Sequence, residues 1–313
     1  MIMSETNCRT AYGKTLVELG RENKNIVALE ADLGKSTMSS LFEAEFPERH
    51  FEMGIAEANM ASTAAGLALA GKIPFIHSFA VFAAGRDYDQ LRQTVGIGGL
   101  KVRVCGSSAG LSDFSDGSTH QSVEDIALMR AIPGMTVICP ADANETVAAV
   151  KAMVDIDGPA YIRICRNPID LITDENRPFE IGKSYILKDG SDIALFATGL
   201  MVTKALEAAK ALEGEISVRV INVPTLKPVC RASMIEAAKG CHGVVTAEEH
   251  SLVGGLGSIV SVMLAEECKP IGFVGIHDQY GCSAHNYEEL LEHYNLTTDA
   301  IVEKVREISK IAK

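Results

Sequence analysis

The sequence has no tryptophan, only 5% aromatic residues and no CxxC pair among its eight cysteines. The missing CxxC pairs argue against a zinc knuckle and against a redox dithiol. Most of the cysteines lie in apolar runs, so we expect buried thiols. The longest run of small and apolar residues, 64–71, is too short to span a bilayer, and the start MIMSETNCR lacks the apolar core of a signal peptide. These absences predict a cytoplasmic protein.

Positive charge is also scarce, with 29 Lys and Arg against 41 Asp and Glu, which gives a formal net charge of −12. Such a surface repels phosphate polymers and anionic membranes, so we expect neither nucleic acid nor a membrane as a partner. A small phosphorylated metabolite is still compatible with this charge, because a few arginines inside a cleft outweigh a distant, screened field.

What the sequence does contain is an alternation of apolar runs and helical patterns in its first half. Continuous apolar strands separated by helices predict a parallel sheet covered on both faces. The expected strands are 26–32, 74–79, 102–106, 136–140 and 160–165, and the expected helices are 10–22, 57–71, 85–95, 121–130 and 142–154.

A second series of the same kind follows residues 165–192, a stretch without a sustained period that we interpret as an interdomain linker. The expected strands are 192–199, 217–226, 243–250 and 272–278, and the expected helices are 202–212, 231–239 and 255–266, before two closing helices. The predicted fold class is therefore α/β, with two consecutive domains, 1–180 and 181–313, each a mainly parallel sheet flanked by helices.

Ligands of open parallel sheets bind beyond the carboxyl ends of the strands, so polar residues that follow strands are candidates for chemistry. Glu57 follows a short strand and opens a helix of small residues. It is either a carboxylate favoured by the helix dipole or a partly buried acid of raised pKa that exchanges a proton with a ring nitrogen. Phe79 and Phe82 are either core residues or a stacking wall for a heteroaromatic ring.

A loop rich in Ser, Asp and Gly carries Asp116 and His120, four residues apart across a glycine. Both side chains could face one cavity, or the loop could only form turns and a helix cap from Ser118 or Thr119. A serine nucleophile is less attractive, because no GxSxG motif is present. Candidates for phosphate binding are Arg9, Ser36, Arg163 and Arg166.

Three of these runs together resemble the second half of transketolase, and the resemblance covers essentially the whole chain. They are GIAEANM, DGSTHQSVEDIALMR and IPGMTVICPADANE. The resemblance implies a pyrimidine-binding domain followed by a transketolase C-terminal domain. It also implies that Glu57 pairs with N1′ of the aminopyrimidine of thiamine diphosphate, that Phe79 and Phe82 line the ring, and that Asp32 belongs to the cofactor site.

By the same resemblance, Asp116 and His120 contact the sugar, and His120 also has a catalytic role. Arg9, Ser36 and Arg166 match residues that hold the substrate phosphate. Two positions depart from many transketolases: Gly85 replaces a third aromatic residue, and Ser108 replaces a histidine that binds phosphate. These departures weaken the expectation of an ordinary phosphopentose substrate.

The family's GDG run, followed by an asparagine, holds the cofactor diphosphate through a metal ion, and this sequence does not contain it. We therefore expect a separate N-terminal transketolase subunit that carries this motif and holds Mg²⁺ or Ca²⁺. The expected assembly is α2β2. The implied reaction transfers a two-carbon ketol unit from a ketose phosphate to an aldose phosphate, with Glu57 protonating N1′.

Two alternatives stay open from the sequence. One is a different thiamine enzyme of the same architecture, either the beta-type subunit of a 2-oxoacid dehydrogenase or a deoxyxylulose-phosphate synthase-like protein. The other is a noncatalytic assembly subunit that keeps the fold.

Overall fold

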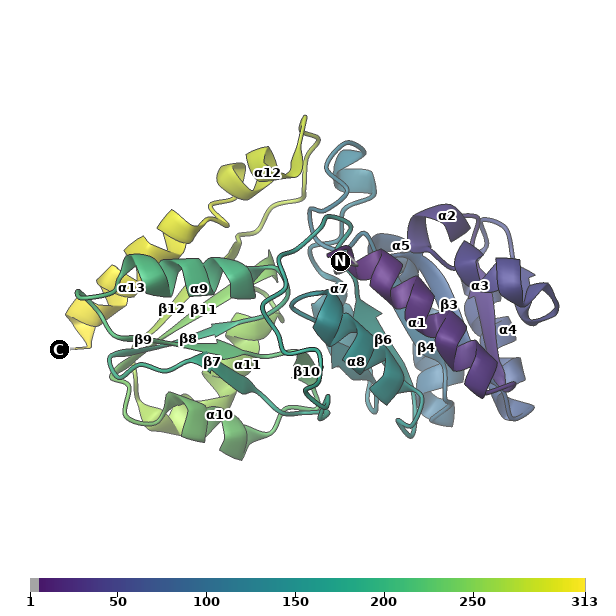
Figure 1. Cartoon of the computed structure of the whole chain (residues 1–313), viewed down its shortest axis with the longest axis horizontal. Helices are drawn as coiled ribbons and strands as arrows, with labels where there is room; N and C mark the ends of the chain where they lie inside the picture. Colours follow the sequence, from purple (N-terminus) through teal and green to yellow (C-terminus); the bar gives the residue numbers. More distant parts are fainter. Residues whose placement is uncertain (1–5, 313) are drawn as a thin grey trace.

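Two β-sheets organise the chain in the computed structural model, which describes residues 6–312. The first has seven strands in the order β10-β5-β6-β4-β3-β1-β2, and the second has five in the order β12-β11-β8-β9-β7. All pairs are parallel except β10 with β5 and β7 with β9. The predicted α/β class with two mainly parallel sheets is confirmed, and Figure 1 shows the two domains side by side.

The first domain begins with a helix and then alternates strands and helices. Its elements are α1 (Cys8–Glu22), β1 (Ile26–Glu30), α2 (Gly34–Thr37), α3 (Ser40–Glu45), η1 (Pro47–Arg49), β2 (His50–Glu52), α4 (Glu57–Leu69), β3 (Ile73–Phe79), α5 (Ala80–Gly85), α6 (Tyr88–Gln90), the π-helical η2 (Leu91–Gly96), β4 (Arg103–Ser107), η3 (Gly117–Thr119), α7 (Asp125–Ala131), β5 (Thr136–Ile138), α8 (Ala143–Met153) and β6 (Ala160–Arg163).

Local sequence explains where these elements form. Strands β1, β4, β5 and β6 are buried at every position, which matches their continuous apolar pattern. Asn7 caps α1 by accepting hydrogen bonds from the N–H groups of Arg9 and Thr10. Asp142 caps α8 by accepting from the N–H of Glu145.

Two predicted helices differ from the structure. The segment predicted as one helix over 85–95 is divided into α5, α6 and η2, because the chain turns at Arg86 and Asp87. The helix predicted over 121–130 begins only at Asp125, because Ser122 forms a β-bridge with Gly110 and keeps the chain extended there. Both differences place polar residues near the carboxyl ends of β3 and β4.

The second domain repeats the alternation around the five-stranded sheet. Its elements are β7 (Tyr185–Lys188), β8 (Ile193–Ala197), α9 (Met201–Ala211), β9 (Val218–Asn222), β10 (Thr225–Lys227), α10 (Arg231–Ala238), β11 (Gly243–Ser251), α11 (Leu256–Met263), η4 (Ala265–Glu267), β12 (Ile271–Ile276), α12 (Tyr287–His293) and α13 (Thr298–Ile311). Helices α9 and α13 cover one face of the sheet, and α10 and α11 cover the other (Figure 1).

A strand that follows the second sheet in sequence belongs to the first sheet, so the two domains are joined more closely than the sequence predicts. The run 217–226, expected to be one strand, divides at Val223 and Pro224, and β10 leaves its own sheet to pair antiparallel with β5 of the first domain. The N–H of Cys139 donates to the carbonyl of Pro224 at 2.8 Å, which extends this pairing. The segment 165–192 is also not wholly a linker, because β7 lies within it.

A buried ion cluster joins the domains where β6, α7 and β11 meet. Arg163, at the end of β6, donates from Nε to Asp125 of α7 at 3.0 Å, and its Nη1 lies 3.8 Å from Glu249 of β11. Tyr161 donates to Asp125 at 2.8 Å, and Tyr287 donates to Glu249 at 2.7 Å. The buried charges are thus paired and hydrogen-bonded, which is the condition for burying them.

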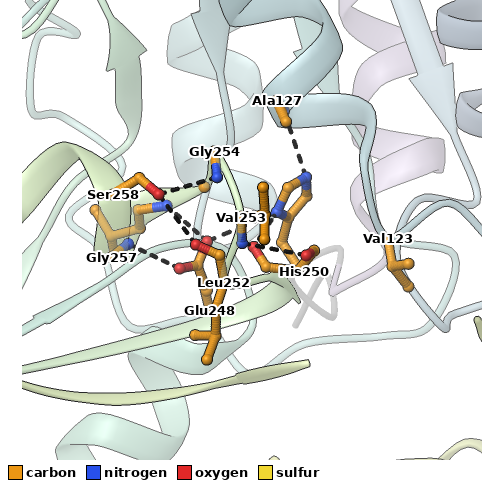
Figure 2. Close-up of polar contacts among 12 residues, drawn as sticks. Val123, Ala127, Glu248, His250, Leu252, Val253, Gly254, Gly257 and Ser258 are labelled. Carbon is orange, nitrogen blue, oxygen red and sulfur yellow. Dashed lines mark hydrogen bonds and ion pairs between the residues drawn. The ribbon is translucent and has the colours of Figure 1, made fainter. Parts of the chain in front are cut away.

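A second contact between the domains joins Ala127 of α7 to His250 of β11 (Figure 2). The N–H of Ala127 in α7 donates to Nε2 of His250 at 3.4 Å. Burial lowers the pKa of His250 to about 4, so its ring is neutral at pH 7 and can accept. Glu248 accepts from the N–H groups of Leu256 and Gly257 at 2.6 and 2.7 Å and so holds the start of α11.

The cysteine prediction is confirmed for Cys8, Cys105, Cys139 and Cys241, which are buried thiols, and is wrong for Cys230 and Cys268, which are exposed. Among residues 6–312, no helix is both long enough and apolar enough to cross a membrane.

Candidate active site at the carboxyl edge of the first sheet

Glu57 begins α4 and is only 3% exposed. Its Oε1 accepts a hydrogen bond from Nη1 of Arg86 at 2.9 Å, and no described group donates to Oε2. The guanidinium of Arg86 in turn lies 4.0 Å from the ring centroid of Phe82, within cation–π range. The carboxylate is thus withdrawn from bulk water and held beside an aromatic ring.

The two predicted wall residues form a stacked pair. The rings of Phe79, at the end of β3, and Phe82, in α5, are 6.2 Å apart with an interplanar angle of 12°. His120 meets both edge-on, at 6.2 Å from Phe79 and 5.3 Å from Phe82. The structure therefore brings His120 from the Ser/Asp/Gly loop to the aromatic wall, together with Glu57 through Arg86.

Arg9, Ser36 and Arg166, far apart in the sequence, lie close together in one group, which we call the arginine cluster. Arg9 donates from Nη1 to the backbone carbonyl of Ser36 at 2.8 Å. Burial lowers the pKa of Arg9, and the nearby charge of Arg166 lowers it further. Arg166 donates to the carboxylate of Asp113 at 3.0 Å and lies 6.0 Å from the ring centroid of Phe79. This cluster therefore adjoins the aromatic wall.

The loop that carries Asp116 leaves that side chain exposed. Its only described side-chain contact is a hydrogen bond from the hydroxyl of Ser115 at 3.3 Å. His120 makes a hydrogen bond with Thr119 through Nδ1 at 2.9 Å. Neither Ser118 nor Thr119 caps the following helix, since α7 begins at Asp125. The carboxylate of Asp116 is consequently available to a ligand.

Asp32, Gly85 and Ser108 have different surroundings; the last two are the positions at which the sequence differs from many transketolases. Asp32 is exposed in a left-handed conformation with φ of 61°, and no described contact joins its side chain to Glu57 or Phe82. An added Cβ at Gly85 would meet no atom within 4 Å, so the wall is open there. Ser108 is fully buried after β4, and its hydroxyl has no hydrogen-bond partner among residues 6–312.

The role of Arg163 as a phosphate-binding candidate is wrong. Its guanidinium is only 6% exposed and is bound to Asp125, to Glu249 and to the backbone carbonyl of Glu249. An arginine with its donors taken by buried acceptors is not free for a ligand.

Sequence reasoning missed three ionisable residues of the candidate site. Arg86 and Asp113 contact Glu57 and Arg166 directly. Asp87 is fully buried with no hydrogen-bond partner for either carboxylate oxygen among the described residues. Its burial raises its pKa well above the usual range, and the neighbouring Glu57 raises it further. The only sequence feature that could have indicated these three residues is that they are polar and follow β3 or β4 within a few positions.

Two family models match the chain in succession. The model of the transketolase pyrimidine binding domain matches residues 4–170, and the model of the transketolase C-terminal domain matches residues 182–301. The chain belongs to the transketolase family. A putative transketolase C-terminal section of Methanocaldococcus jannaschii is 41% identical over 307 residues, 96% of either chain. A 6-deoxy-6-sulfo-D-fructose transketolase subunit, SqwH, of a Clostridium species is 41% identical and covers 96% of this chain and 94% of the relative.

A solved structure described as a split gene transketolase, inactive beta4 tetramer, is 44% identical and has a TM-score of 0.89. It covers 99% of this chain, and the match includes 100% of that chain. The chain is therefore a C-terminal subunit of the split transketolase type, and membership of the family implies dependence on thiamine diphosphate.

Proposed function

We propose that this chain transfers a two-carbon ketol unit from a ketose phosphate to an aldose phosphate, together with a separate subunit that binds the diphosphate of thiamine diphosphate. The observation that supports this most is the buried carboxylate of Glu57, which is joined through Arg86 to the stacked rings of Phe79 and Phe82. An acid beside an aromatic wall fits an aminopyrimidine, which needs both a proton partner at N1′ and a stacking surface.

Bound thiamine diphosphate would supply the carbon centre that carries the two-carbon unit. The chain's own residues place that group and move protons around it. Glu57 holds the N1′ proton through Oε2, because Oε1 is bound to Arg86. Phe79 and Phe82 orient the ring. His120, in edge contact with both rings, binds the reacting end of the sugar and exchanges protons with its oxygens.

The substrate lies along the same edge of the sheet. Arg9, Ser36 and Arg166 hold its anionic tail, and Asp116 accepts a hydrogen bond from one of its hydroxyl groups. Arg9 and Arg166 lie together beside Phe79, which supports an orientation of the substrate with its anionic tail at one end of the aromatic wall. Asp32 completes the cofactor side of the site.

The partner subunit carries the GDG run and the asparagine and holds Mg²⁺ or Ca²⁺ with the diphosphate, and the assembly is α2β2. The surface around α4 supports this. Ile55, before α4, Leu69, at its end, and Ile97, after η2, are each more than 70% exposed. Gly66 has no atom within 4 Å of an added Cβ, so another backbone can approach α4 closely. The similar beta4 tetramer is described as inactive, which accords with a requirement for a partner.

The test is to purify the chain with a GDG-containing subunit, add thiamine diphosphate and Mg²⁺, and compare wild type with Glu57→Gln. We expect turnover of a ketose donor only when both subunits are present. The variant should lose at least about 10²-fold in kcat, the usual range for a proton-transfer group, while its unfolding curve stays unchanged. The donor screen includes a ketose phosphate, 6-deoxy-6-sulfo-D-fructose and pyruvate.

Wild-type kcat in Glu57→Gln would remove Glu57 from the mechanism. Turnover of pyruvate alone would favour a deoxyxylulose-phosphate synthase-like or 2-oxoacid enzyme. A complex that binds the cofactor but turns over no donor would favour an assembly subunit.

A further inference from the structure

The arginine cluster contains a buried carboxylate, that of Asp113. Asp113 is 2% exposed, and its carboxylate accepts from Nη1 of Arg166 at 3.0 Å. Arg166 itself is 34% exposed, so the arginine faces the site while the carboxylate lies behind it. A carboxylate at this position repels an anionic ligand and so lowers the affinity of the subsite for a dianion.

The backbone around Asp113 is held in place on both sides. Its carbonyl accepts from Nε2 of Gln121 at 3.1 Å. The carbonyl of Ser112 accepts from Nδ2 of Asn167 at 3.0 Å, and the hydroxyl of Ser112 accepts from the N–H of Arg166 at 3.2 Å. These contacts tie the loop to the segment after β6. The carboxylate therefore stays beside Arg166 when a ligand enters.

Charges in and around the cluster are few. Arg9 and Arg166 contribute two positive charges, and Asp113 removes one of them. Burial raises the pKa of Asp113, while Arg166 opposes this; Asp116, His120 and Arg9 are the other charged or titratable groups that act on it. With Asp113 ionised, the two arginines and this carboxylate carry a single net positive charge toward the tail of the substrate.

We propose that Asp113 is a specificity-determining residue, which shifts the preference of the tail subsite from a dianionic phosphate toward a monoanionic group such as a sulfonate. This rests on the proposed function, because it assumes that Arg9 and Arg166 hold the tail. A phosphate monoester is mostly a dianion above its second pKa of about 6, whereas a sulfonate carries one charge. Asp113 repels the dianion about twice as strongly as the monoanion.

The test uses the complex of both subunits at pH 7.5 and the variant Asp113→Asn, which keeps an acceptor for Arg166 and removes the charge. Donors are fructose 6-phosphate and 6-deoxy-6-sulfo-D-fructose. We expect the ratio of kcat/KM for the phosphate over the sulfonate to rise by about tenfold, the effect of one unit charge at partly screened range. The change should fall mainly on KM. Glu236→Gln, which removes one exposed charge on α10, should leave the ratio unchanged.

A second readout does not depend on turnover. NMR titration of the complex with methyl phosphate and with methanesulfonate should show tighter binding of both anions in Asp113→Asn, with the larger gain for methyl phosphate. Asp113→Ser, a smaller residue without charge, should move both readouts in the same direction and guards against a folding defect peculiar to asparagine. Equal changes for both tails, or no change in either variant, would overturn the role of Asp113. If no ketose is turned over but the titration shows the shift, the proposed reaction fails while the charge preference stands.

Discussion

Arg163 is the cation that balances two buried carboxylates at the domain junction, so its replacement by methionine should destabilise the protein strongly. Asp125 is fully buried and Glu249 is 3% exposed. Without Arg163, Asp125 keeps the hydroxyl of Tyr161, and Glu249 keeps the hydroxyl of Tyr287 and the N–H of Leu111. Both then lack an opposing charge.

Removing one partner of a buried ion pair costs about 3–5 kcal/mol, because the remaining charge is uncompensated. The hydrogen bonds that remain place the expected loss in the lower part of that range, about 3 kcal/mol. The assay is equilibrium unfolding of the purified chain in urea at pH 7.5, followed by far-UV circular dichroism. Arg163→Lys keeps the positive charge but not the several N–H donors of the guanidinium, so its loss of unfolding free energy should be smaller than that of Arg163→Met.

A third variant separates charge from packing. Arg163→Met combined with Asp125→Asn should recover part of the lost stability, because one of the two unpaired charges is gone. A loss below about 1 kcal/mol in Arg163→Met, with an unchanged dependence on urea, would refute the reasoning, since that is the size of an exposed ion pair.

Two further predictions concern buried carboxylates. Gly110→Ala should lower the free energy of unfolding by about 2 kcal/mol or more in the same urea assay. The reason is that Gly110 has φ of 65° and an added Cβ would overlap the carboxylate of Glu249. An unchanged free energy of unfolding would show that the loop can shift. Burial raises the pKa of Glu30 from 4.5 to about 7, so the stability that its protonated form contributes is present below pH 4.5 and is lost as pH rises through 7. Glu30→Gln, which still accepts from the N–H of Ala31, should therefore lose less stability than wild type between pH 5.5 and pH 8 in thermal unfolding, and an identical loss in both would contradict this origin.

The sequence was sufficient for the parts of the fold that depend on local patterns. Apolar runs and helical periodicity located most strands of both sheets, although not β7 and not β10 as a separate strand, and the position of Glu57 after β2 located the start of α4. Pairings over long sequence distances were not predictable in this way. The pairing of β10 with β5 of the first sheet joins segments far apart in the sequence, which no local pattern encodes.

The site shows the same division. Glu57, Phe79, Phe82 and His120 were predicted from their positions after strands and from family motifs. In the structure Phe79, Phe82 and His120 are in ring contact, and Arg86 joins Glu57 to Phe82. Arg163, by contrast, resembles a ligand-binding arginine in the sequence and is a structural cation, because its partners come from residues 38 and 86 positions away. Charge pairing depends on the folded neighbourhood, and periodicity carries no information about it.

None of the predicted ligand-binding residues lies in the described part of the second domain, yet contacts from this domain position the loop 111–121 of the first domain. The N–H of Leu111 donates to Glu249 at 2.8 Å, and Nε2 of Gln121 donates to the carbonyl of Cys282 at 3.0 Å. The N–H of Ala284 donates to the carbonyl of Phe114 at 2.9 Å. Three points of one loop are thus fixed by the second domain.

The loop between Leu111 and Gln121 carries Asp116 and His120, which are proposed to bind the sugar. It also carries Asp113, which is proposed to set the preference for the tail of the substrate. The Ser, Asp and Gly residues of this loop supply no apolar contacts, so the loop would be mobile if only its ends were held. Phe114, in its middle, packs against the core of the second domain. Anchoring by the second domain reduces the conformational entropy that the loop must lose when substrate binds. Under the proposed function, the C-terminal domain therefore acts on the chemistry through the geometry of this loop. The buried ion cluster of Arg163, Asp125 and Glu249 supports that geometry, because Glu249 holds the N–H of Leu111 at the start of the loop.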